Sequence, residues 1–124
     1  MTRAALVLSM TLTAAPAAAH HSAAATYDAT QSVPITGIVT SFAWTNPHSH
    51  LYVDVTDGPF KGQEYVIELS SPVVLKEAGW SRASFKAGDR VTVRVLPSRT
   101  GAAIGLCRGC VVRVNGVTKP RTVQ

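Results

Sequence analysis

The segment HSHLYVDV, residues 48–55, alternates between polar and apolar side chains and decides the fold class. A period of two is typical of a half-buried β-strand, because successive side chains of a strand point to opposite faces of the sheet. The apolar face is formed by Leu51, Val53 and Val55, and the polar face by His48, His50, Tyr52 and Asp54. The segment therefore predicts a sheet that buries one side of this strand.

Four further segments have strand character. Residues 34–42 are rich in β-branched residues and contain Gly37, which indicates a bend or a bulge. Residues 64–69 and 90–96 alternate again, and the short run at residues 111–114 predicts a last strand. The side chains expected to face inward from the two alternating segments are Tyr65, Ile67, Leu69, Val91, Val93 and Val95.

One helix is expected between the third and fourth strands. Ser71 stands in the position of an N-cap, Pro72 in the first helical position, and the helical pattern ends at Gly79. Trp80 follows this glycine and is expected to fold back onto the core.

The order of three strands, one helix and two strands predicts a mainly β fold. It is the order of a small OB-like five-stranded Greek-key barrel, in which closure removes the exposed sheet edges. A small α+β roll with the same elements is the alternative. We expect a flexible N-terminal arm over residues 20–32, the barrel over residues 33–116 and a C-terminal tail over residues 117–124.

Residues 1–19 have the parts of an export signal. A positive charge near the start is followed by an uncharged apolar stretch, residues 4–15, and by a small-residue cleavage site at residues 17–19. The apolar run is shorter than the ~20 residues that cross a bilayer, and no later segment is a membrane candidate. We therefore expect cleavage between Ala19 and His20 and a periplasmic or secreted protein that does not span a membrane.

Positive charge gathers late in the chain, whose net charge is +5. From Asp89 onward a single acid is accompanied by Arg90, Arg94, Arg99, Arg108, Arg113, Lys119 and Arg121. Such a surface attracts anionic polymers or membranes in some proteins, but a solvated face is the interpretation we favour. Nucleic acid is not an expected partner, because single-strand binders need aromatic platforms and only Phe42, Trp44, Tyr52 and Tyr65 lie in the relevant strands. An enzyme is not favoured, because no G-x-S-x-G elbow and no phosphate-binding glycine loop occurs.

The two cysteines, Cys107 and Cys110, lie in the sequence GLCRGC. An even cysteine count in an oxidising compartment predicts a disulfide, and two free thiols are the alternative. Redox-active pairs usually open a helix, whereas a strand-like sequence follows this pair. We therefore expect a structural role.

All four histidines fall into two clusters that could hold a metal ion: His20 with His21, and His48 with His50. Cleavage after Ala19 would make His20 the first residue, so that its α-amine and its imidazole could chelate one ion together. The second pair lies on one strand face, roughly 6–7 Å apart at the Cα positions. Copper favours such nitrogen ligands, and zinc is the second choice. We expect a non-enzymatic metal-binding protein.

Trp44 and Asn46 support a second hypothesis. Trp44 could form the floor of a shallow ligand site with Asn46 and His48 on its rim, although Trp44 in the core and Asn46-Pro47 as a turn is the simpler interpretation. The chain would then be a cell-envelope module that binds a small ligand or another protein without a metal.

Several motifs occur together along the chain. They are AHHS at residues 19–22, TGIV at 36–39, AWTNPH at 43–48, GW at 79–80 and KAGDRVTV at 86–93. In these motifs the chain resembles a family of small exported proteins of Gram-negative bacteria that is classed as a domain of unknown function. The resemblance implies a periplasmic β domain but no activity. It maps recurrent histidines of the family onto His20, His21 and His48, whereas His50 and the cysteine pair look particular to this chain.

Overall fold

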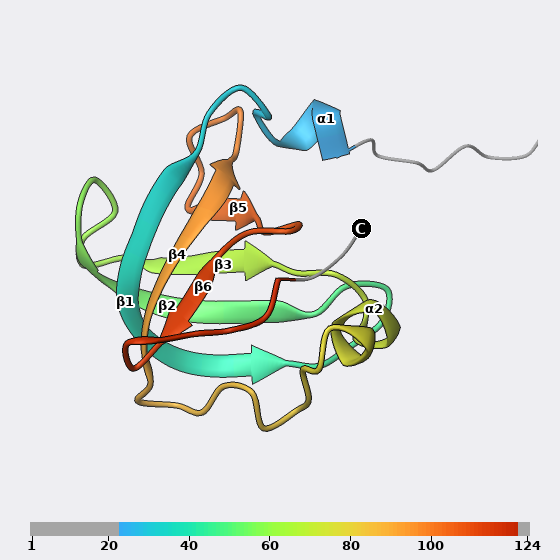
Figure 1. The fold of residues 1–124 in the computed structure, drawn as a ribbon. Coiled ribbons are helices and arrows are strands. Elements are labelled where there is room, and N and C mark those ends of the chain that lie inside the picture. The colour runs from blue at the N-terminus through green and yellow to red at the C-terminus, as the bar shows by residue number, and fades with distance from the viewer. Residues whose placement is uncertain (1–22, 122–124) are drawn as a thin grey trace, which may run out of the picture.

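The computed structural model describes residues 23–121, and Figure 1 shows the arrangement of their elements. Two short helices, α1 (Ala23–Thr26) and α2 (Pro72–Glu77), accompany the strands. The strands are β1 (Val33–Ala43), β2 (His50–Asp57), β3 (Glu64–Glu68), β4 (Arg90–Pro97), β5 (Ile104–Leu106), β6 (Val112–Val114) and β7 (Val117–Thr118). No helix within the described range is long and apolar enough to cross a membrane.

The first five strands close into a barrel. β1 pairs with both β2 and β4, β2 pairs with β3, and β5 lies between β3 and β4. The barrel is mixed, because β3 and β5 run parallel while the other pairs are antiparallel. The prediction of a mainly β, five-stranded barrel with a helix between the third and fourth strands is confirmed.

The fifth barrel strand differs from the expected one. The sequence predicts a last strand at residues 111–114, but that segment forms β6, which pairs with β4 beside the closed ring. The ring is completed by β5, which is only three residues long and has Gly105 at its centre. A Cβ at Gly105 would overlap the side chains of Val95 and Tyr65. Only a glycine fits in this close packing. Because glycine has no side chain to add to an alternating pattern, the sequence does not predict this strand.

The interior of the barrel is formed by the predicted alternating rows. Val53, Tyr65, Ile67 and Val91 are completely buried. The other inward-facing positions are at most 4% exposed; they are Leu51, Val55, Leu69, Val93 and Val95. The bend expected in the first strand is also present, since the register of β1 against β2 shifts next to Gly37. A Cβ at Gly37 would overlap the backbone carbonyl of Asp54, so the two strands approach too closely for a larger residue.

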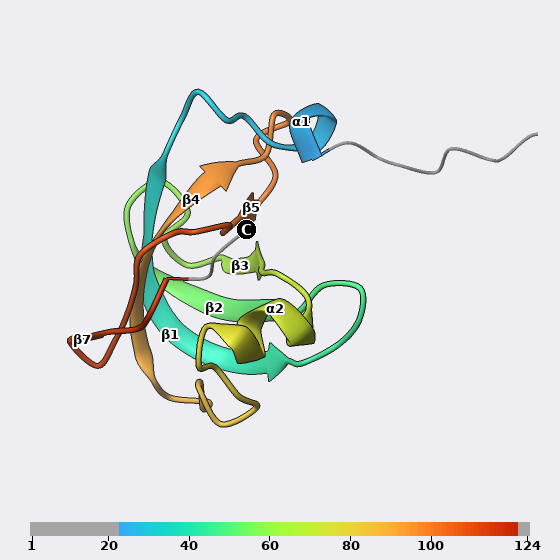
Figure 2. The ribbon, with the colours of Figure 1, turned by 45° about the vertical axis from the view of Figure 1, so that its right-hand side comes forward.

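The helix α2 lies beside the carboxyl ends of β1 and β3 (Figure 2). Ser71 occupies the N-cap position, but its side chain makes no capping hydrogen bond. Gly79 has φ +82°, and the Trp80 amide then donates to the Leu75 carbonyl at 2.9 Å, which ends the helix. Leu75 and Trp80 both belong to the core, and Trp80 is only 2% exposed, which confirms that it folds back.

Candidate functional site

Glu68, the last residue of β3, is the centre of a polar cluster on the outside of the barrel. The hydroxyl of Tyr27 donates to Oε2 of Glu68 at 2.6 Å. Nδ1 of His48 lies 2.6 Å from Oε1 of the same carboxylate. The side chain of Glu68 is 19% exposed and that of His48 is 39% exposed, so the carboxylate is covered while the imidazole remains open to solvent.

The contact with Glu68 fixes the orientation of the His48 ring and the nitrogen that carries its proton. A carboxylate only accepts hydrogen bonds, so Nδ1 carries the proton and Nε2 keeps its lone pair in the neutral imidazole. Histidines that bind metals commonly use this arrangement, in which a carboxylate on one ring nitrogen orients the other nitrogen and increases its basicity. The geometry therefore prepares Nε2 of His48 as a ligand.

Tyr27 holds the other oxygen of this carboxylate. Burial, followed by the hydrogen bond to Glu68, raises the pKa of the Tyr27 hydroxyl well above its ordinary value. The phenol therefore stays protonated at neutral pH and continues to donate to Glu68.

Tyr27 also attaches the segment before β1 to the barrel. Within the segment expected to form an arm, the residues from Ala23 onward make specific contacts with the barrel. Tyr27 is 6% exposed and forms an isolated bridge with Ser98, and the Arg99 amide donates to the Thr26 carbonyl at 3.0 Å. No sequence periodicity marks a single buried tyrosine, so the pattern could not indicate this attachment.

The backbone around His48 explains its position beside Glu68. His48 precedes β2, which begins two residues later, in a turn that contains the cis Asn46–Pro47 peptide bond. The hydroxyl of Thr45 donates to the His48 carbonyl at 3.0 Å. Ser49 then extends the pairing of β2 with β3, because its carbonyl accepts the Leu69 amide at 2.8 Å.

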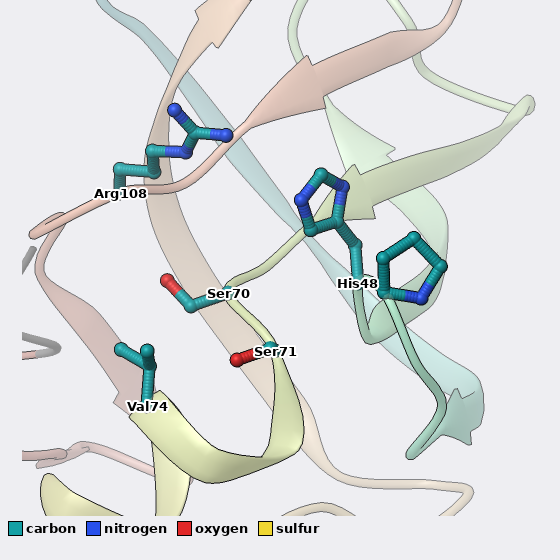
Figure 3. A pocket seen from close by; sticks show the side chains of 6 residues that line it. His48, Ser70, Ser71, Val74 and Arg108 are labelled. Atoms are coloured by element: carbon teal, nitrogen blue, oxygen red, sulfur yellow. The ribbon is translucent and has the colours of Figure 1, made fainter. Parts of the chain in front are cut away.

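A hollow of about 280 Å³ lies next to this cluster, and Figure 3 shows the side chains around it. The guanidinium of Arg108 and the imidazole of His48 stand on opposite sides. Ser70, Ser71 and Val74 lie below them, and Pro47 adds a further apolar wall.

The disulfide loop presents Arg108 to the hollow. The structure joins Cys107 to Cys110, whose Cα atoms are 5.2 Å apart. The Cys107 amide donates to the backbone carbonyl of Glu68 at 2.8 Å, so the loop begins directly beside the carboxylate cluster. Neither cysteine is a free thiol.

The remaining predicted site residues lie apart from the hollow. His50 begins β2 and stands opposite Glu68 in the register, but it does not line the hollow. Trp44 packs edge to face against Phe42, with ring centroids 5.8 Å apart, and lines a separate groove beside α2. Asn46 is exposed and lines neither space, so the structure does not place it with Trp44.

The predicted metal ligands are only partly described. His20 and His21 lie outside residues 23–121. Within that range, no three side chains of the types His, Cys, Asp and Glu gather closely enough to hold a metal ion. A metal ion bound by His48 would therefore need donors from outside these residues.

Sequence reasoning missed Tyr27, Glu68 and Arg108 as members of the site. Glu68 is separated from Tyr27 by 41 positions. Only the register of β2 against β3 brings it beside His48. The alternating pattern did place Glu68 on the outer face of its strand, which was the one available signal.

The chain belongs to a family of unknown function, DUF6152, whose model matches residues 7–108. The matched stretch includes all four histidines as well as Tyr27, Glu68 and Arg108. No curated protein and no solved structure matches the chain. The family assignment agrees with the resemblance seen in the motifs.

Proposed function

We propose that this DUF6152 protein is exported, is cleaved after Ala19, and binds a metal ion without catalysing a reaction. Copper is the first choice and zinc the second. The ligands are the terminal amine and imidazole of His20, with His21, and Nε2 of His48. The observation that carries the proposal is the 2.6 Å contact between His48 Nδ1 and Glu68, which orients the ring and leaves Nε2 available as a ligand.

The attachment of the N-terminal segment supports a shared site. Tyr27, six positions after His21, donates to the carboxylate that also holds His48. Arg108 lines both the hollow beside His48 and a second one that is lined by Ala23. His20 precedes Ala23 by three positions, a length of chain that reaches at most about 10 Å.

The donor set favours copper. A terminal amine and the imidazole of the same residue supply two nitrogens, and His48 supplies a third. Nitrogen ligands in a tetragonal arrangement suit Cu(II), whereas structural zinc sites use four protein ligands, commonly including thiolates. Both cysteines are already joined in the disulfide and cannot serve as thiolates.

Calorimetric titration of mature protein, residues 20–124, with Cu(II) tests the proposal. His48→Gln is expected to lower the affinity at least about 100-fold, beyond the 10–100-fold typical of outer-shell partners. His50→Gln is the matched control, because His50 lies outside the hollow, and its affinity should stay within about 2-fold of that of the parent. Equal affinities for the parent, His48→Gln and a peptide of residues 20–26 would refute the joint site.

A second experiment tests the terminal chelate. Acetylation of the His20 α-amine removes this nitrogen as a ligand while leaving the folded domain unchanged. The affinity for Cu(II) should fall, and the melting temperature of the metal-free protein should not change. Mass spectrometry of the exported protein would establish the terminus on which this test depends.

The groove beside Trp44 favours a second candidate function, a cell-envelope module that binds a small ligand or a protein. The groove has a volume of about 560 Å³, and it is lined by Trp44, Pro72, Val73, Lys76, Ser81, Arg82 and Ala83. Val73 is 64% exposed, which is high for a large apolar side chain. Cross-linking from a photoreactive residue at position 73 in intact cells should then capture one specific partner, and Trp44→Ala should abolish this product.

A further inference from the structure

We infer that the hollow between Arg108 and His48 binds a small oxyanion, a carboxylate or phosphate group, in the metal-free protein. This inference goes beyond the proposed metal function and does not depend on it. It rests on three observations. Hydrogen-bond donors line the hollow, the neighbouring carboxylate of Glu68 already has other partners, and the disulfide loop supports Arg108.

Three of the side chains that line the hollow are hydrogen-bond donors without partners among the described residues. Among residues 23–121, no hydrogen bond or ion pair engages the guanidinium of Arg108 or the hydroxyls of Ser70 and Ser71. A guanidinium presents several N–H groups in one plane and pairs with a carboxylate or a phosphate through two parallel hydrogen bonds. Two serine hydroxyls nearby add further donors.

The protein does not supply the anion that these donors need. Glu68 is the neighbouring acid, but Oε1 faces His48 and Oε2 accepts from Tyr27. Both oxygens of Glu68 are therefore engaged, and among residues 23–121 no ion pair joins Glu68 to the guanidinium of Arg108.

The backbone that carries Arg108 is held on both sides. Cys107 is 1% exposed, is joined to Cys110 and donates to the Glu68 carbonyl. Because this end of the loop is fixed, less entropy is lost when the guanidinium binds a ligand than for an arginine on a free loop.

The shape of the hollow limits the ligand to a small one. Its volume of about 280 Å³ lies below that of most sites for drug-sized molecules. Val74 and Pro47 provide apolar walls opposite the donors, which suits a carboxylate on a short apolar chain. Inorganic phosphate would use the same donors but not these walls.

Titration of metal-free mature protein, followed by amide chemical shifts in two-dimensional NMR, tests the inference. Sodium butyrate and inorganic phosphate are the two probes, each compared with sodium chloride at equal ionic strength. Saturable shifts are expected at Ser70, Ser71 and Arg108, and tighter binding of butyrate or of phosphate identifies the source of the oxyanion.

Arg108→Gln should weaken the binding of the better probe at least about 10-fold, the loss expected for a charge-assisted hydrogen bond. Arg113→Gln makes the same change of charge at the exposed central position of β6, outside this hollow, and should leave the dissociation constant within about 2-fold of that of the parent. Absence of saturable shifts with both probes, or equal weakening by the two variants, would overturn the inference. The test contains no metal, so its result is independent of the copper proposal.

Discussion

Two carboxylates, Glu68 and Asp89, are each held by two partners, yet the partners differ in kind. Asp89 accepts from the backbone amide of Lys86 at 2.8 Å and from the side-chain amide of Asn115 at 2.9 Å. These donors close the turn before β4 and tie it to the turn after β6. Glu68 instead contacts two side chains, the phenol of Tyr27 and the imidazole of His48, and both come from other parts of the chain.

Under the proposed function, this difference separates a structural carboxylate from a carboxylate that orients a metal ligand. The partners of Asp89 have no further chemistry to offer, and they lower the pKa of its carboxyl, the Lys86 amide contributing most. One partner of Glu68 leaves a ring nitrogen beside a hollow. Changes at Asp89 should therefore affect stability alone, and changes at Glu68 should affect the metal site.

Of the changes at the two carboxylates, Glu68→Gln should have the largest effect on copper affinity. The amide keeps the shape of the side chain but loses the charge that orients His48, so the affinity for Cu(II) should fall about 10–100-fold. Calorimetric titration measures this change, and Asp89→Asn serves as the control with an unchanged affinity. A Glu68→Gln variant that binds Cu(II) as tightly as the parent would remove the distinction between the two carboxylates.

Asp89→Ala should give the largest loss of stability. Two hydrogen bonds to an ionised acceptor disappear, and a melting temperature lower by about 3–8 °C is expected for a domain of this size. Thermal unfolding followed by circular dichroism measures the shift. Its affinity for Cu(II) should match that of the parent, and a parallel loss of copper binding would show that the two clusters are coupled.

Tyr27→Phe sharpens the comparison at Glu68. The variant removes one donor from the carboxylate and should destabilise the fold by about 1 kcal/mol. It should also weaken Cu(II) binding, but less than Glu68→Gln does, because His48 keeps its charged partner. Tyr65→Phe is the matched control: the Tyr65 hydroxyl donates to the Ile104 carbonyl at 2.8 Å, away from the site. Tyr65→Phe should lower the free energy of unfolding by a similar amount without changing the affinity for Cu(II).

The smallest expected effect is a change with pH in the contribution of Asp89 to the melting temperature. A lowered pKa in the folded state means that Asp89 stabilises the fold above the ordinary carboxyl pKa, and that this contribution is lost as the pH falls through the lowered value. The difference in melting temperature between the parent and Asp89→Asn should therefore shrink below about pH 4. A difference that stays constant from pH 6 to pH 3 would show that the hydrogen bonds of Asp89 do not favour its ionised form.

The sequence was informative wherever one residue pattern repeats along an element. Alternation placed Leu51, Ile67 and Val93 inside the barrel, and turn chemistry placed the helix that begins at Pro72. β5 escaped prediction because three residues around Gly105 carry no periodic signal, and its parallel pairing to β3 is set by distant chain segments.

The site could be predicted only in part for a related reason. His48 stood out by its residue type, because imidazoles are common ligands. Its partners Glu68 and Tyr27 did not, since an outward acid and a single aromatic residue are ordinary features of any sequence. Their roles arise from strand register and from the docking of the segment before β1, and the local spacing of residues predicts neither of these.

Electron paramagnetic resonance of one equivalent of Cu(II) bound to the mature protein tests the central claim most directly. If His48 and the terminal His20 share the ion, His48→Gln should replace one nitrogen ligand and change the copper spectrum, whereas His50→Gln should leave it unchanged. Identical spectra for the parent and His48→Gln would contradict the account, because the ion would then be held without the imidazole that Glu68 orients.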